Sequence, residues 1–165
     1  MTPDPKAKEA LILARIRAKM AWPYFGHALM ALQPIEEPKV AEMGGLGFGV
    51  DRYWRLYYDP KAVAAMSVED SAIGLRHEII HLLRKHHQRA GNFPGANHKL
   101  VNICQDAEIN DDIAEDCKHN ASVAIFKNMK LLDSDMTPTK LNEIFGTTCK
   151  DGDLWESYYQ AILDK

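Results

Sequence analysis

The stretch SVEDSAIGLRHEIIHLL, residues 67–83, decides the fold of this chain. Ser67 is a favoured N-cap residue, and the acidic residues that follow it suit the first turn of a helix. Apolar residues then recur at helical spacing, which predicts one long helix with a buried face. At 100° per residue, the expected core face comprises Ala72, Leu75, Ile79, Leu82 and Leu83.

The same helix carries an H-E-x-x-H motif, His77-Glu78-Ile79-Ile80-His81. His77 and His81 lie one turn apart on a face distinct from the core face, where two imidazoles can bind one zinc ion. Glu78 is close enough to accept the proton of a water molecule held there. Gly74 on this face would allow another backbone to approach closely. The alternative is a pair of surface histidines on an ordinary amphipathic helix.

The end of this helix decides which further residues can join the site. Arg84 is a good helix former, so the helix is expected to continue to about Arg89. In a continuous helix His87 cannot reach an ion bound by His81, and His86 falls on the core side as a hydrogen-bonded packing residue. Arg84 lies on the metal face, where it could pair with an acid or a substrate carboxylate, or remain solvated.

A third metal ligand is therefore expected from a second long helix, at about residues 99–116. Asp106 and Asn110 form an i, i+4 pair beside its apolar stripe, which favours Asp106 as the ligand and Asn110 as the side chain that orients a ligand. Glu108 and His98 are rival ligands. The alternative is that Asp106 is a half-buried structural acid.

The rest of the sequence predicts a mostly helical α+β domain with one small β-hairpin. Aromatic residues around a polar turn indicate the hairpin at 44–58, and two prolines indicate a loop around Pro34 and Pro38. The segment 118–138 is expected to be irregular. Further helices are expected at 5–22, 24–32, 61–66, 140–144 and 154–163.

Composition limits the class of protein. A length of 165 residues with 46% hydrophobic and 26% charged residues fits one globular domain, residues 1–165. A net charge of −3 gives no electrostatic case for binding nucleic acid or an anionic membrane. The sequence gives no indication of oligomeric state.

Cysteine usage and the N-terminus bear on the compartment. The three cysteines are an odd number without C-x-x-C spacing, which fits a reducing compartment and argues against a cysteine-built zinc site. There is no pattern typical of a secretion signal or a membrane span. The expected location is cytoplasmic.

The chain resembles a family of predicted zinc metallopeptidase domains of the zincin type, which often precede von Willebrand A-like domains in bacterial and phage proteins. The resemblance implies a zincin-like fold with an H-E-x-x-H active-site helix, and it places Asp106 at the downstream acidic position of the family. It rests on residues 23–26, 56–60, 76–83 and His86, on Asn102-Ile103, Asp106 and Ile109-Asn110, and on residues 156–159.

The expected function is zinc-dependent hydrolysis of a peptide or protein substrate, with Glu78 as the general base. Tyr158 or Tyr159 could stabilise the oxyanion, although core packing is the expected role of both. One alternative is a catalytically silent zincin-like module that binds metal and acts in phage or host regulation or in protein interaction. A purely structural zinc site is the other alternative.

Overall fold

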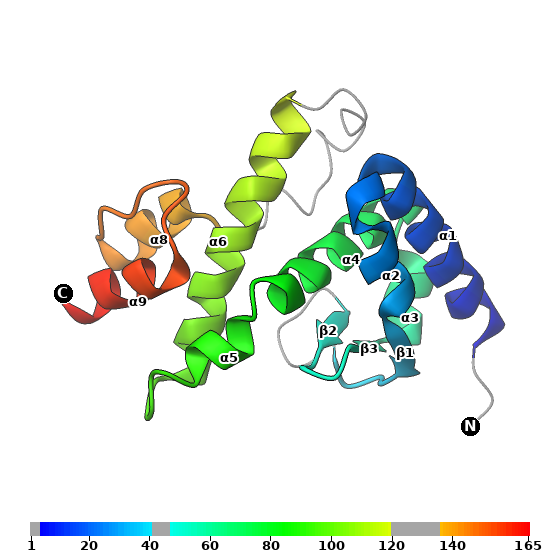
Figure 1. Ribbon diagram of the computed structural model, residues 1–165, viewed down its shortest axis with the longest axis horizontal. Helices are drawn as coiled ribbons and strands as arrows, with labels where there is room; N and C mark the ends of the chain where they lie inside the picture. Colours follow the sequence, from blue (N-terminus) through cyan, green and yellow to red (C-terminus); the bar gives the residue numbers. More distant parts are fainter. Residues whose placement is uncertain (1–3, 41–46, 120–135) are drawn as a thin grey trace. The chain divides into compact units, whose positions relative to one another are not determined.

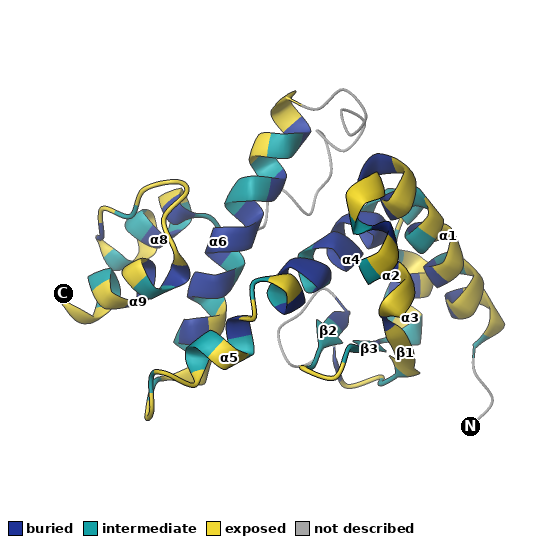
Figure 2. Cartoon of the chain, viewed as in Figure 1, coloured by how far each residue is buried: buried dark blue, intermediate teal, exposed yellow. Residues whose placement is uncertain are grey.

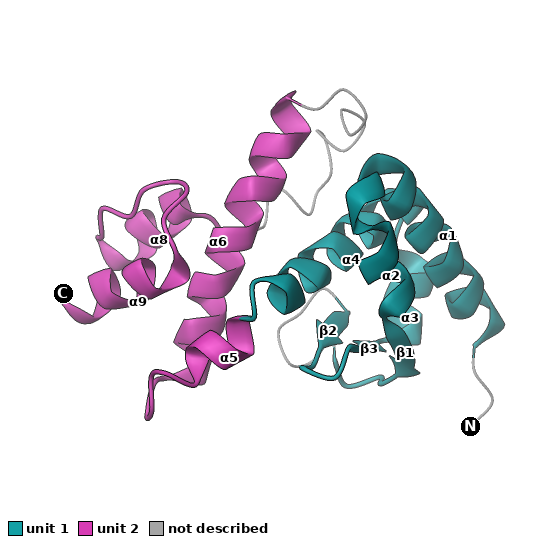
Figure 3. Ribbon diagram, viewed as in Figure 1, with its two compact units in different colours: residues 1–85 teal, residues 86–165 magenta. Residues whose placement is uncertain are grey.

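The computed structural model describes residues 4–40, 47–119 and 136–165 (Figure 1). These residues form mostly helices with one small three-stranded sheet, so the predicted α+β class is confirmed at this level. The chain divides into two compact units, residues 1–85 and residues 86–165 (Figure 3). Among the described residues no helix is long and apolar enough to cross a membrane.

The elements follow the expected order closely. Unit 1 contains α1 (Pro5–Ala21), η1 (Pro23–Phe25), α2 (Gly26–Ala31), β1 (Gln33–Glu36), β2 (Phe48–Val50), β3 (Arg55–Tyr58), α3 (Pro60–Ala65) and α4 (Val68–Leu83). Unit 2 contains α5 (His86–Ala90), α6 (His98–His119), α8 (Pro138–Phe145) and α9 (Trp155–Leu163).

Helix α1 begins and ends as its sequence predicts. The Asp4 carboxylate accepts hydrogen bonds from the first backbone N–H groups of the helix, and Pro5 occupies the first turn. Its buried face is built mainly from small residues, which allow α1 and α4 to pack closely in unit 1. These buried residues are Ala7, Leu11, Ala14, Ala18 and Ala21.

The sheet has the strand order β1-β3-β2. Strands β2 and β3 pair antiparallel with Phe48 opposite Tyr58, which confirms the predicted hairpin, although residues 44–46 lie outside the described part of the chain. The loop predicted around Pro34 is wrong, because residues 33–36 form β1 and pair parallel with β3. Proline lacks an N–H donor, and β1 tolerates it because this strand lies at the edge of the sheet.

Helix α4 is the central element of unit 1. Ser67 caps it by accepting a hydrogen bond from the backbone N–H of Asp70, as predicted. Its core face is confirmed except for Leu83, which is 47% exposed. A Cβ atom at Gly74 would lie 2.9 Å from the ring of Phe48, so glycine here admits a side chain of β2, where the sequence suggested a backbone.

Helix α4 ends at Leu83, so the expectation that it continues to about Arg89 is wrong. Arg84 is the C-cap, and Lys85 adopts a left-handed φ of 53° while its N–H donates to the carbonyl of Leu82. A separate short helix, α5, follows. Helix propensity at Arg84 is only a weak preference, and the burial of His86 in unit 2 overrides it.

Unit 2 is built around α6, which packs against α8 and α9. Tyr158 and Tyr159 belong to its buried core, so their expected packing role is confirmed. Figure 2 shows buried positions along both α6 and α9. The segment expected to be irregular, 118–138, lies mostly outside the described residues. The buried members of this core are Val101, Cys104, Ala107, Leu141, Trp155, Tyr158 and Tyr159.

Candidate metal centre

The two histidines of the motif face each other on α4. The Nε2 atoms of His77 and His81 lie 3.0 Å apart, and the ring centroids are 4.8 Å apart. Both side chains are half-buried. At this distance one imidazole donates an N–H to the other. The two Nε2 atoms therefore point toward the same place on the helix surface.

Glu78 and Arg76 flank His77 along the same helix, in different surroundings. Glu78 is half-buried. Arg76 is buried, 4% exposed, and its guanidinium lies 4.7 Å from the centroid of a ring of Trp22 and 6.0 Å from that of Phe25. This cation–π contact fixes the buried side of α4 against the end of α1 and the start of the next helix. No feature of the sequence pattern predicts a buried arginine at this position.

Asp106 lies on α6 and is half-buried. Its carboxylate accepts a hydrogen bond of 3.2 Å from the side-chain amide of Asn102, one turn earlier. Asn110, the residue expected to orient a ligand, is buried and donates at 2.9 Å to the backbone carbonyl of Met136. Asn102 was not among the expected site residues, although its i, i+4 spacing to Asp106 on a helix predicts this contact.

The other residues considered as metal ligands lie in different surroundings. Glu108 is buried in unit 2 among hydrogen-bond donors, and His98 is exposed at the start of α6. His86 is buried with its Nε2 atom 3.4 Å from Glu108, which confirms the predicted packing histidine. His87 is half-buried on α5. Because α4 ends at Leu83, helix continuity does not exclude His87 as a ligand, but His87 is not part of the group of side chains that could hold a metal ion.

Cys104, on the same helix as Asp106, is not expected to bind a metal ion. Cys104 is fully buried on α6, and burial raises its pKa to about 12, with a further contribution from the negative charges of Cys149 and Asp106. Because the thiolate is the form that binds metal, a thiol with this pKa is a poor ligand near neutral pH.

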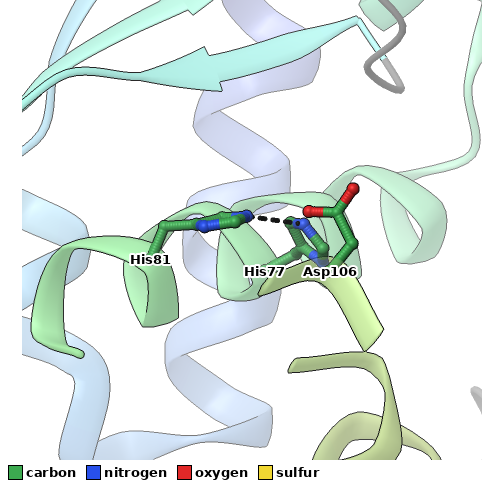
Figure 4. A group of neighbouring side chains, drawn as sticks. All are labelled: His77, His81 and Asp106. Carbon is green, nitrogen blue, oxygen red and sulfur yellow. Dashed lines mark hydrogen bonds between the residues drawn. The ribbon is translucent and has the colours of Figure 1, made fainter. Parts of the chain in front are cut away.

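Within the described residues, one group of side chains could hold a metal ion. It consists of His77, His81 and Asp106, and one ligand atom from each lies within 4.8 Å of the others (Figure 4). The two-nitrogen, one-oxygen donor set is of a kind that suits a transition metal.

Comparison with known proteins identifies the family of the chain. A family model described as "Putative metallopeptidase domain" matches residues 6–142, a range that includes the H-E-x-x-H motif and Asp106. Neither the curated proteins nor the solved structures gave a match. The chain therefore belongs to the family described as a "Putative metallopeptidase domain".

Proposed function

We propose that this protein is a zinc-dependent peptidase whose metal ligands are His77, His81 and Asp106, with Glu78 as the general base. The observation that carries the proposal is the convergence of three ligand atoms within 4.8 Å, with a carboxylate next to one of the ligands on α4. Family membership supports the same class of reaction.

The donor set favours a catalytic role over a structural one. Structural zinc sites are closed by four protein ligands, commonly with several cysteines, whereas catalytic sites have three protein ligands and an open position. When bound, the zinc ion would lower the pKa of a water molecule and polarise the scissile carbonyl.

The remaining chemistry belongs to the side chains of the protein. Glu78 accepts a proton from the attacking water and delivers it to the leaving amine. Glu78 directly follows the ligand His77 on α4 and is half-buried.

The substrate we propose is an extended peptide that pairs with the outer strand β2. In the strand order β1-β3-β2, one side of β2 pairs with β3, and Phe48 of this strand packs against Gly74, one turn before His77. Main-chain hydrogen bonds to an edge strand bind a peptide without strict sequence preference. Unstructured proteins are therefore the suitable test substrates.

Glu78→Gln tests the catalytic assignment. The variant should keep about one zinc ion per chain by metal analysis and lose cleavage of casein by a factor of about 10²–10⁴. Glu69→Gln is the matched control on the same helix, since Glu69 pairs with Arg17 near the surface and should leave cleavage unchanged. Persistent cleavage by Glu78→Gln would show that this base is wrongly assigned.

The metal ligands are tested separately from activity. Asp106→Ala should lower zinc affinity at least tenfold, whereas Glu115→Ala, which removes an exposed acid from the same helix, should not change it. Unchanged affinity in Asp106→Ala would exclude Asp106 as a ligand. Zinc binding by the parent protein without cleavage of any unstructured substrate would instead support a silent metal-binding module.

A further inference from the structure

A buried carboxylate, Glu108, lies at the centre of unit 2. Its side chain is only 3% exposed and accepts a 2.8 Å hydrogen bond from the backbone N–H of Trp155 at the start of α9. Two nitrogens of Arg89 lie 3.4–3.5 Å from its oxygens, and the Nε2 atom of His86 lies 3.4 Å away. A buried charge is strongly destabilising unless it is paired, so this network keeps α5, α6 and α9 in one arrangement.

The network fixes the rotation of α6 about its own axis. Glu108 follows Asp106 by two residues, which is about 200° around a helix, so the two carboxylates lie on nearly opposite faces. Glu108 can keep its partners only in one rotational setting of α6. That setting also determines the direction in which the Asp106 side chain projects from α6.

The network also attaches α6 to the chain that has just left α4. The side-chain amide of Gln105 donates at 3.3 Å to the carbonyl of His86, and Glu108 pairs with the ring of the same residue. Gln105 and Glu108 share a face of α6 because they are three residues apart. Only Arg84 and Lys85 separate His86 from the last residue of α4.

We propose that Glu108, acting with His86 and Arg89, is a positioning residue of the metal centre, which holds α6 in the setting that presents Asp106 as the third ligand. This inference rests on the proposed zinc site. It assigns to Glu108 a role different from the ligand role that the sequence left open. The carboxylate acts through Asp106 and does not touch the metal.

Glu108→Gln is the direct test. Glutamine has nearly the same shape and can still accept the hydrogen bond of Trp155, but it loses the charge that pairs with Arg89. The variant should bind Zn²⁺ and Co²⁺ about 10–100-fold more weakly in competition with a chromophoric chelator, with helix content unchanged by circular dichroism. The d–d absorption of the Co²⁺ form should change in intensity, because a displaced carboxylate alters the coordination geometry.

The matched control is Glu156→Gln. Glu156 is the other carboxylate paired with Arg89, through both Nε and an Nη atom, but it belongs to α9 and is more exposed. This variant also removes a negative charge that pairs with Arg89, but it leaves α6 unchanged. Its metal affinity should therefore stay within about twofold of the parent. Equal losses in both variants would overturn the inference, because a general loss of the Arg89 pairs would then explain them.

A double-mutant cycle separates positioning from general stability. If Glu108 acts through Asp106, Glu108→Gln should not weaken metal binding further in an Asp106→Ala background. Additive losses would overturn the inference. If Glu108→Gln does not fold, His86→Gln tests the same attachment. It should weaken metal binding in the parent background but not in the Asp106→Ala background.

The two proposals can fail separately. Parent-like metal affinity in Glu108→Gln, together with a loss in Asp106→Ala, would reject the positioning role and leave the zinc site intact. Parent-like affinity in Asp106→Ala would reject the ligand assignment itself, and the positioning role with it.

Discussion

The Nε2 atoms of His77 and His81, one turn apart on α4, lie 3.0 Å from each other. This separation is close to that of two nitrogens bound to one metal ion, so the helix holds the pair near a metal-binding geometry. Both rings are half-buried, which limits the access of water to their nitrogens.

Zinc should stabilise the folded protein. An ion that binds only the folded state at 100 times its Kd adds about 2.7 kcal/mol to the free energy of unfolding. We expect the melting temperature to rise when Zn²⁺ is added to chelator-treated protein, and to stay unchanged with Mg²⁺, which prefers oxygen ligands. The rise should disappear in His77→Ala and His81→Ala. A rise of equal size in both variants would place the zinc elsewhere.

The two asparagines of α6 should affect different properties. Asn102 donates to the Asp106 carboxylate, so Asn102→Ala should weaken zinc binding with little loss of stability. Asn110 is buried and donates to the backbone carbonyl of Met136, so Asn110→Ala should cost about 1–3 kcal/mol of unfolding free energy. Chelator competition and urea unfolding measure the two effects. The opposite pattern would support Asn110 as the residue that orients the ligand.

Lys85→Gly should stabilise the protein. Lys85 is exposed and has a φ of 53°, a conformation that costs a side-chain-bearing residue about 1 kcal/mol relative to glycine. The melting temperature should rise by roughly 2–4 °C. Lys85→Ala, which keeps a Cβ atom, is the control and should give no such rise. Equal effects of the two changes would argue that the lysine side chain, not the backbone, determines the result.

Gly74→Ala should destabilise unit 1. The new Cβ atom would lie 2.9 Å from the Phe48 ring, and such overpacking costs typically about 1–3 kcal/mol. The same substitution in a Phe48→Leu background should cost less, because the smaller side chain gives way. Thermal unfolding of the four proteins in this cycle measures the coupling. A cost that does not depend on residue 48 would locate the strain elsewhere.

The sequence alone determined much of the local structure. The caps at Asp4 and Ser67, the hairpin and the spacing of His77 and His81 follow from hydrogen-bond chemistry within a few residues, which a sequence carries explicitly. The prediction that Asp106 and the motif contribute to one metal site also came from helix spacing, and it awaits its metal test.

Long-range packing decided the rest. Helix α4 stops at Leu83 although Arg84 favours helix, because the next buried residue, His86, is held by Glu108 from 22 positions away. Pro34 lies in a strand because a partner 22 residues later supplies the ladder. Glu108 is a rival metal ligand by sequence, whereas its partners on α5 and α9 make it part of a buried network in unit 2. Local propensities are small compared with the free energy of burying a charge or an apolar face, so only the tertiary structure could decide these positions.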